Sequence, residues 1–106
     1  MDQVIKRLRQ FRDDRDWKQF HNPKDLAMAL SIEAGELLEA FLWKASEAAD
    51  TEKVKEELAD VLAYALLLSD AYGFDVQKIV LEKIERNEAK YPVDKAKGSA
   101  KKYTEL

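Results

Sequence analysis

The sequence predicts an all-α protein, built as a small four-helix bundle. Three observations support this fold class: apolar residues recur at helical spacing, helix start and stop signals divide the chain into four segments, and turn-forming residues are scarce. Glycine occurs three times and proline twice in 106 residues, too rarely for the many turns of an all-β fold. A chain of this length is expected to form a single domain, residues 1–106.

The first two helices follow from periodicity and from a capping signal. Residues 2–15 are expected to be helical because their apolar side chains recur at helical spacing: Val4, Ile5, Leu8 and Phe11. Residues 16–21 lack a clear period and are expected to form a connector. Asn22 can cap a second helix with Pro23 at its first position, and this helix is expected to reach Lys44.

The third helix is expected to begin after a cap at Asp50 or Thr51, to run to Tyr72 and to end at Gly73. Between Leu58 and Leu68 it is apolar on nearly every side, so it must be surrounded by other helices. Three partner helices from the same short chain do not suffice for this. We therefore expect a homo-oligomer that buries much of the third helix between subunits.

The fourth helix is expected to begin after Asp75 and to continue to Lys90, stopping before Pro92. Residues 92–106 then form a locally basic tail, whose composition favours a solvated segment. The lysines of this tail are Lys95, Lys97, Lys101 and Lys102.

Composition also argues against several classes of protein. The net charge of −3 does not suggest a nucleic-acid partner, which normally requires a basic surface. The absence of cysteine excludes a disulfide scaffold and a thiolate zinc site. The apolar run 61–68 is too short to cross a bilayer, so we expect no membrane association and a cytoplasmic protein. The sequence also lacks the glycine-rich loops that bind phosphates through backbone amides.

Two short acidic motifs are the main functional signal. Glu33 and Glu36 lie three residues apart in the second helix, and Glu57 and Asp60 lie three residues apart in the third, so each pair shares one side of its helix. If the two helices pack antiparallel, the four groups can converge, and a divalent cation would offset their mutual repulsion. Carboxylates without histidine or cysteine favour Mg²⁺ or Mn²⁺ over zinc.

The motifs leave other interpretations open. Such pairs are frequent on solvated helix faces, and a helical oligomerisation module without chemistry would leave all four carboxylates facing solvent. A di-iron bundle protein would need Glu-x-x-His pairs, and the single histidine, His21, has no glutamate three residues before it.

Together with their flanks, these motifs resemble a known family, the MazG-like all-α nucleoside triphosphate pyrophosphohydrolases, and within it the dCTP pyrophosphatase branch. The two acidic motifs are separated by twenty residues, which is similar to the family signature. The resemblance covers nearly the whole chain. Its segments are Arg15–Lys24, Glu33–Lys44, Glu56–Leu62, Asn87, Tyr91–Val93 and Gly98–Leu106.

The resemblance implies an enzyme that hydrolyses a nucleoside triphosphate, dCTP or a related dNTP, between the α and β phosphates. The products would be the monophosphate and pyrophosphate, and the role would be the clearing of nucleotide pools. The same reaction on dATP, dUTP or a modified nucleotide is the alternative. The resemblance further implies a homotetramer, a dimer of dimers, and Mg²⁺ held by Glu33, Glu36, Glu57 and Asp60. Either Glu36 or Glu33 would accept the proton of the attacking water.

Substrate-binding residues are expected on four segments of the chain. Trp17, His21 and Trp43 match positions that resemble the base pocket of the family, and flat rings suit stacking on a nucleobase. Tyr64 shares the side of the third helix that carries Glu57, so either a pocket or a core position fits it. On the fourth helix, Lys83 and Asn87 match positions that resemble ligand contacts of the family, and Tyr91, directly after the helix, continues the same stripe.

Overall fold

A computed structural model describes residues 1–106, and every regular element in it is helical, which confirms the prediction of an all-α protein. It contains five α-helices rather than the four predicted, because a short helix also forms in the tail after Pro92. The chain divides into two compact units, Met1–Gly73 and Phe74–Leu106. The α-helices of the first unit are α1 (Asp2–Asp14), α2 (Pro23–Glu39) and α3 (Thr51–Ala71). Those of the second unit are α4 (Val76–Lys90) and α5 (Val93–Ala96). Three short 3-10 helices complete the chain: η1 (Lys18–Phe20), η2 (Ser46–Ala48) and η3 (Tyr103–Glu105).

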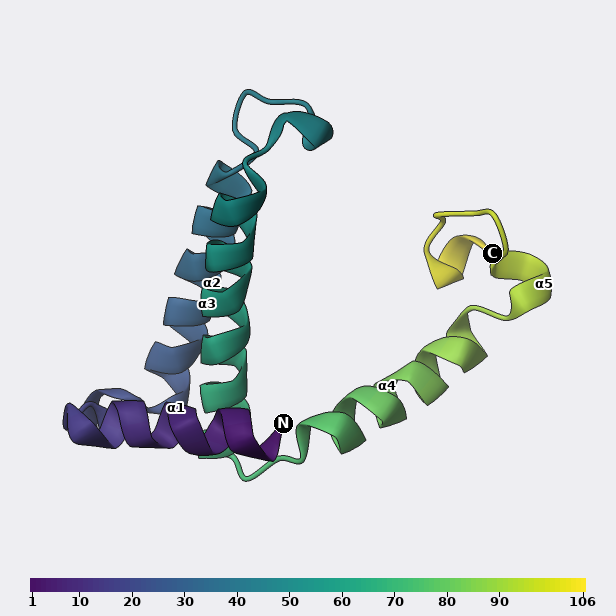
Figure 1. Cartoon of the computed structure of the whole chain (residues 1–106). Helices are drawn as coiled ribbons and strands as arrows, with labels where there is room; N and C mark the ends of the chain where they lie inside the picture. The colour runs from purple at the N-terminus through teal and green to yellow at the C-terminus, as the bar shows by residue number, and fades with distance from the viewer. The chain divides into compact units, whose positions relative to one another are not determined.

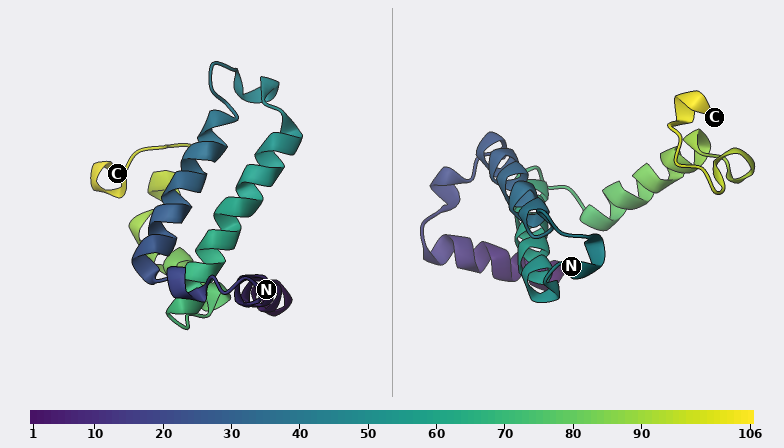
Figure 2. Two further views of the ribbon diagram at one scale, coloured as in Figure 1. Left: turned by 90° about the vertical axis from the view of Figure 1, so that its left-hand side faces the viewer. Right: turned by 90° about the horizontal axis from the view of Figure 1, so that it is seen from above.

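The centre of the first unit is an antiparallel pair of helices, α2 and α3, which lie side by side along their length (Figure 1; Figure 2, left). Asn22 caps α2 as predicted, because its side chain accepts a hydrogen bond from the backbone N–H of Asp25 at 2.9 Å. Leu26 in the first turns of α2 is only 2% exposed. The other buried apolar residues are Ala40, Leu66 and Leu67.

The second helix is five residues shorter than the sequence predicted, because α2 ends at Glu39 rather than at Lys44. After Glu39 the backbone N–H groups bond to carbonyls three residues back, as in a tightening last turn, for example Leu42 to Glu39 at 3.1 Å. Trp43 then takes a φ of 60°, the left-handed conformation that ends many helices. Glycine usually occupies such a position, so the sequence carried no visible stop signal here.

The third helix agrees with the prediction to within one residue at its end. Asp50 caps α3 by accepting a hydrogen bond from the N–H of Glu52 at 3.0 Å. Gly73 follows its end with a φ of 70°, which an L side chain would adopt only with strain. The two acidic motifs are therefore held on neighbouring, well-capped helices.

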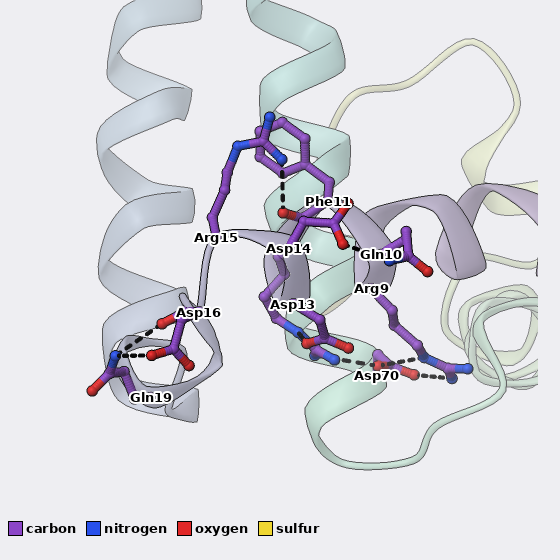
Figure 3. A network of polar contacts seen from close by, with 10 residues as sticks. Arg9, Gln10, Phe11, Asp13, Asp14, Arg15, Asp16, Gln19 and Asp70 are labelled. Carbon is purple, nitrogen blue, oxygen red and sulfur yellow. Dashed lines mark hydrogen bonds and ion pairs between the residues drawn. The ribbon is translucent and has the colours of Figure 1, made fainter.

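The first helix crosses the pair near the C-terminal end of α3 (Figure 1). Figure 3 shows Arg9 of α1 reaching Asp70 of α3: its Nε donates to Asp70 Oδ2 at 2.9 Å, and its Nη2 bonds to Oδ1. Arg12 Nη1 lies 3.9 Å from the same carboxylate. The hydrogen bond from Arg9 lowers the pKa of Asp70, so this ion pair ties α1 to α3.

The second unit consists of α4 and the segment that follows it. Asp75 caps α4 through the N–H of Lys78 at 3.1 Å, as predicted. In the tail, the ring of Tyr103 meets that of Tyr91 edge to face at 6.1 Å, and Lys90 Nζ lies 4.9 Å from the centre of the Tyr103 ring. The tail, expected as a solvated segment, thus holds two short helices and an aromatic contact, while most of its residues stay exposed. No helix of the protein combines the length and the apolar character needed to cross a bilayer.

Candidate metal centre and adjoining pocket

Three carboxylates from the two acidic motifs meet between α2 and α3. Glu33, Glu36 and Glu57 each offer an oxygen, and these oxygens lie within 4.8 Å of one another. The arrangement follows from the sequence, because Glu33 and Glu36 are one helical turn apart on α2 and Glu57 lies on the antiparallel neighbour. We call these three residues the carboxylate cluster.

Asp60, the fourth acidic residue of the motifs, lies three residues after Glu57 on α3, outside the carboxylate cluster as defined by that distance. Its charge nevertheless acts on Glu33, whose pKa it helps to raise. Asp60 also lines a cavity of the first unit, so it both acts on the cluster and borders that cavity.

Glu33 is the acid of the cluster whose ionisation its surroundings disfavour. The pKa of Glu33 is raised from 4.5 to about 7, chiefly by the desolvation of its carboxyl group and next by a hydrogen bond with Glu36. The charges of Glu36, Asp60 and Glu57 raise it further. Near neutral pH, the carboxyl group of Glu33 is therefore partly protonated unless another positive charge offsets the surrounding negative charges.

Two oxygens of the cluster are buried without any hydrogen-bond partner, Glu33 Oε2 and Glu57 Oε2. A buried acceptor without a partner costs free energy, so such atoms in a native fold call for an explanation. A set of carboxylate oxygens with two unpaired members fits a hard divalent cation, which prefers oxygen ligands. The residues present thus match the cation that the sequence motifs suggested.

One cation of the protein itself contacts the cluster, and sequence reasoning did not single it out. Lys53 Nζ lies 3.1 Å from Glu57 Oε1, in a salt bridge between residues four apart on α3. The hydrogen bond to Glu57 raises the pKa of Lys53. The spacing of Lys53 and Glu57 was a signal available in the sequence. It was weak, because such pairs are common on solvated helices.

A cavity of about 120 Å³ adjoins Asp60 in the first unit. It brings together three of the predicted substrate-binding residues, Trp17, His21 and Tyr64. The sequence did not indicate that five further residues line this cavity; it suggested helix packing for some of them and no role for the others. The five residues are Leu8, Phe11, Arg12, Ala63 and Leu67.

The local backbone explains how the rings reach this cavity. Asp16 has a φ of 56°, a left-handed conformation that aspartate tolerates, and it turns the chain after α1. Trp17 then meets the ring of Phe11 edge to face at 5.7 Å and lies 6.5 Å from the ring of His21. His21 Nδ1 is buried without a partner, and burial together with the charge of Arg12 lowers the pKa of His21. A neutral imidazole with a free nitrogen therefore faces this region at pH 7.

The remaining predicted residues lie elsewhere in the chain. Trp43 sits in the connection after α2 and is 93% exposed. Lys83 and Asn87 lie on α4 and Tyr91 directly follows it, so all three belong to the second unit. The N–H of Tyr91 donates to the carbonyl of Asn87 at 2.8 Å, which closes the last turn of α4.

Comparison with known proteins agrees with this geometry. The model of the MazG-like family matches residues 28–106. The chain is 40% identical over 111 residues to dCTP pyrophosphatase 1 of Rattus norvegicus and to that of Homo sapiens, and each match covers 96% of this chain. The chain spans 65% of the length of each of these two relatives.

A solved structure is also similar, that of a pyrophosphatase from Archaeoglobus fulgidus. It matches with a TM-score of 0.81 and 43% identity, over 87% of this chain and 92% of the other. The chain therefore belongs to the MazG-like family. Within that family its resemblance to the dCTP pyrophosphatase branch, expected from the acidic motifs and their flanks, is confirmed.

Proposed function

We propose that this protein hydrolyses a nucleoside triphosphate between the α and β phosphates, giving the monophosphate and pyrophosphate. The observation that supports this best is the carboxylate cluster, with Asp60 linking it to a cavity that contains aromatic rings. A triphosphate joined to a base has matching chemistry, since one end requires a cation and the other offers a flat ring. The names of the two curated relatives and of the archaeal structure support the same class of reaction.

The metal of this site would be Mg²⁺, with Mn²⁺ as a substitute, held by Glu33, Glu36, Glu57 and Asp60. When bound, the cation supplies charge neutralisation for the phosphates and a lowered pKa for an attacking water. The two unpaired buried oxygens, Glu33 Oε2 and Glu57 Oε2, support this assignment because both are acceptors that lack a donor.

The proton of the attacking water would pass to a carboxylate of the same cluster. Glu33, with a pKa of about 7, can take up a proton near neutral pH, and its carboxyl group is hydrogen-bonded to that of Glu36. Either residue would serve as the base. Water then forms the new bond to the α phosphorus, and the bond to the bridging oxygen breaks with pyrophosphate as the leaving group.

The base would bind in the cavity beside Asp60, against Trp17, His21 and Tyr64. We propose dCTP as the preferred substrate, with dATP, dUTP or a modified nucleotide as the alternatives. Trp43 would add a further ring for the base. Lys83, Asn87 and Tyr91 would contact the phosphates or the sugar, because they offer a cation, an amide and a phenol.

We further propose that the protein is a homotetramer, a dimer of dimers. Large apolar side chains remain exposed on both central helices of the single chain, Ile32 at 62% and Leu38 at 71% on α2, and Leu62 at 54% on α3. Exposed apolar surface on neighbouring helices is typical of protein interfaces. A helical oligomerisation module without chemistry is the competing interpretation, and it predicts no response to Mg²⁺.

One experiment tests the proposed reaction and its substrate. The purified protein is incubated in MgCl₂ with one triphosphate at a time: dCTP, dATP, dGTP, dUTP or a base-modified dCTP. The release of pyrophosphate and of orthophosphate is measured in each reaction. We expect pyrophosphate and monophosphate in equal amounts, fastest from dCTP, and none when EDTA is present. Release of orthophosphate alone, or no release from any triphosphate, would refute the proposal.

A further inference from the structure

Lys53 occupies a special position next to the carboxylate cluster. It lies on α3 one turn before Glu57, and its Nζ is 3.1 Å from Glu57 Oε1. Among the four acidic residues of the two motifs, Glu57 is the one that forms an ion pair within the protein. Lys53 thus brings a positive side chain into contact with the carboxylate cluster, although it belongs to neither acidic motif.

The two oxygens of Glu57 are in different environments. Oε1 accepts from Lys53, whereas Oε2 is buried and has no partner. The side chain of Glu57 is 11% exposed and that of Lys53 is 52% exposed, so the lysine reaches the carboxylate from the solvent side. Lysine before glutamate is the less favourable order for such a pair on a helix, but here the partner is a buried carboxylate, and a nearby positive charge offsets part of the cost of its burial.

We propose that Lys53 is a tethered counter-cation of the carboxylate cluster, which stabilises the cluster and raises the Mg²⁺ concentration at which the site fills. This inference rests on the proposed metal site and concerns how that site is tuned. Lys53 is a positioning residue in this account, because it acts on the cation through Glu57 and has no assigned contact with the substrate.

The charge of Lys53 has two effects at this site. Carboxylates within 4.8 Å of one another repel. When no divalent cation is bound, the positive charge of Lys53 beside Glu57 offsets part of this repulsion. The same charge repels a divalent cation that approaches Glu57 from its other oxygen. Both effects are moderate, since the lysine is half exposed and solvent and salt screen its charge.

The test compares Lys53→Met with Lys55→Met, which removes the same charge from the same helix. Lys55 is exposed and forms no ion pair, so it controls for general effects of charge and of an added apolar side chain. Thermal unfolding is measured in EDTA, and MgCl₂ binding to the full chain is measured by calorimetry at one fixed pH.

Relative to Lys55→Met, we expect Lys53→Met to lower the melting temperature in EDTA by about 2–4 °C. We also expect its Kd for Mg²⁺ to fall by about three- to tenfold. Lys53→Arg, which retains the charge, should restore both values to those of the wild type. Lys53→Gln with Lys55→Gln repeats the comparison without an added apolar group, should the Met variants be poorly soluble.

Both changes are required. If Lys53→Met matches Lys55→Met in either measurement, or if its Kd for Mg²⁺ rises, the role proposed for Lys53 is wrong. The failures of the two proposals are distinguishable. If the wild type neither binds Mg²⁺ nor is stabilised by it, the metal site itself fails and this inference fails with it.

Discussion

At the scale of single residues, Glu33 shows how far a helical glutamate departs from its usual chemistry when three other acids surround it. Its pKa is raised to about 7, above the value of 4.5 that it has in an unfolded chain. Between these two values the folded protein therefore binds more protons than the unfolded protein. The free energy of unfolding must fall as pH rises through this window.

We therefore predict that, in EDTA, the protein loses stability between about pH 4.5 and pH 7 through Glu33. Glu33→Gln removes the titrating group and keeps the shape, so its melting temperature should fall less over the same range. Thermal unfolding of both proteins at pH 5 and pH 8 measures this difference, and the other carboxyl groups cancel in the comparison. Equal pH dependence in the two proteins would mean that Glu33 ionises normally.

Trp43 is a second residue with a testable role, since it is 93% exposed and its backbone is left-handed. If it stacks on the base, Trp43→Ala should raise KM several-fold and weaken the choice between bases, with little loss of kcat at saturating substrate. Steady-state kinetics on dCTP and dATP measure both effects, and Trp43→Phe, which keeps a flat ring, is the control. An unchanged KM and an unchanged preference would remove Trp43 from the binding site.

The sequence allowed the acidic residues to be predicted because their spacing fixes their side of each helix. It did not reveal Lys53, Arg12 or Leu8. The pairing of Lys53 depends on the burial of Glu57, which periodicity alone does not determine. Leu8 belongs to the apolar side of α1, and only the crossing of α1 over α3 shows that this side also borders a cavity.

At the scale of elements, helix starts were predicted better than helix ends. The starts of α2, α3 and α4 carry side-chain caps at Asn22, Asp50 and Asp75, and each of these residues forms the expected hydrogen bond. The end of α3 was equally visible because Gly73 follows it. The end of α2 was not, because a tryptophan takes the left-handed position that usually belongs to glycine.

The cap of α2 gives a prediction about stability. Asn22→Ala removes the acceptor for the N–H of Asp25 and should lower the free energy of unfolding by about 1 kcal/mol. Urea unfolding measures the change, and Asn22→Ser, which keeps an oxygen acceptor, should retain most of the stability. A loss of the same size in the serine variant would show that the cap hydrogen bond is not the cause.

At the scale of the whole molecule, the apolar character of α3 indicates an assembly of several chains. Between Leu58 and Leu68 this helix is apolar on nearly every side, and in the single chain Leu58 and Leu62 remain 44% and 54% exposed. Tetramer formation stays a prediction. The physical requirement that apolar surface of this kind be covered predicts an oligomer, and the number four comes from the family resemblance.

Light scattering after gel filtration tests the assembly. We predict a mass four times the 12.2 kDa of one chain. Leu38→Glu, which places a charge at a side chain 71% exposed in the single chain, should shift the protein to a smaller species. A wild-type mass of 12.2 kDa would contradict the prediction.

The central claim is that acidic residues of α2 and α3 together hold the cation needed to cleave a triphosphate. Its most direct test measures Mg²⁺-dependent pyrophosphate release from dCTP by the wild type, by Glu36→Gln and by Asp60→Asn, with the oligomeric mass of each protein checked. We predict that both variants lose activity by at least about a hundredfold and keep the wild-type mass, because each loses a charged oxygen ligand. Wild-type rates in either variant would contradict the account.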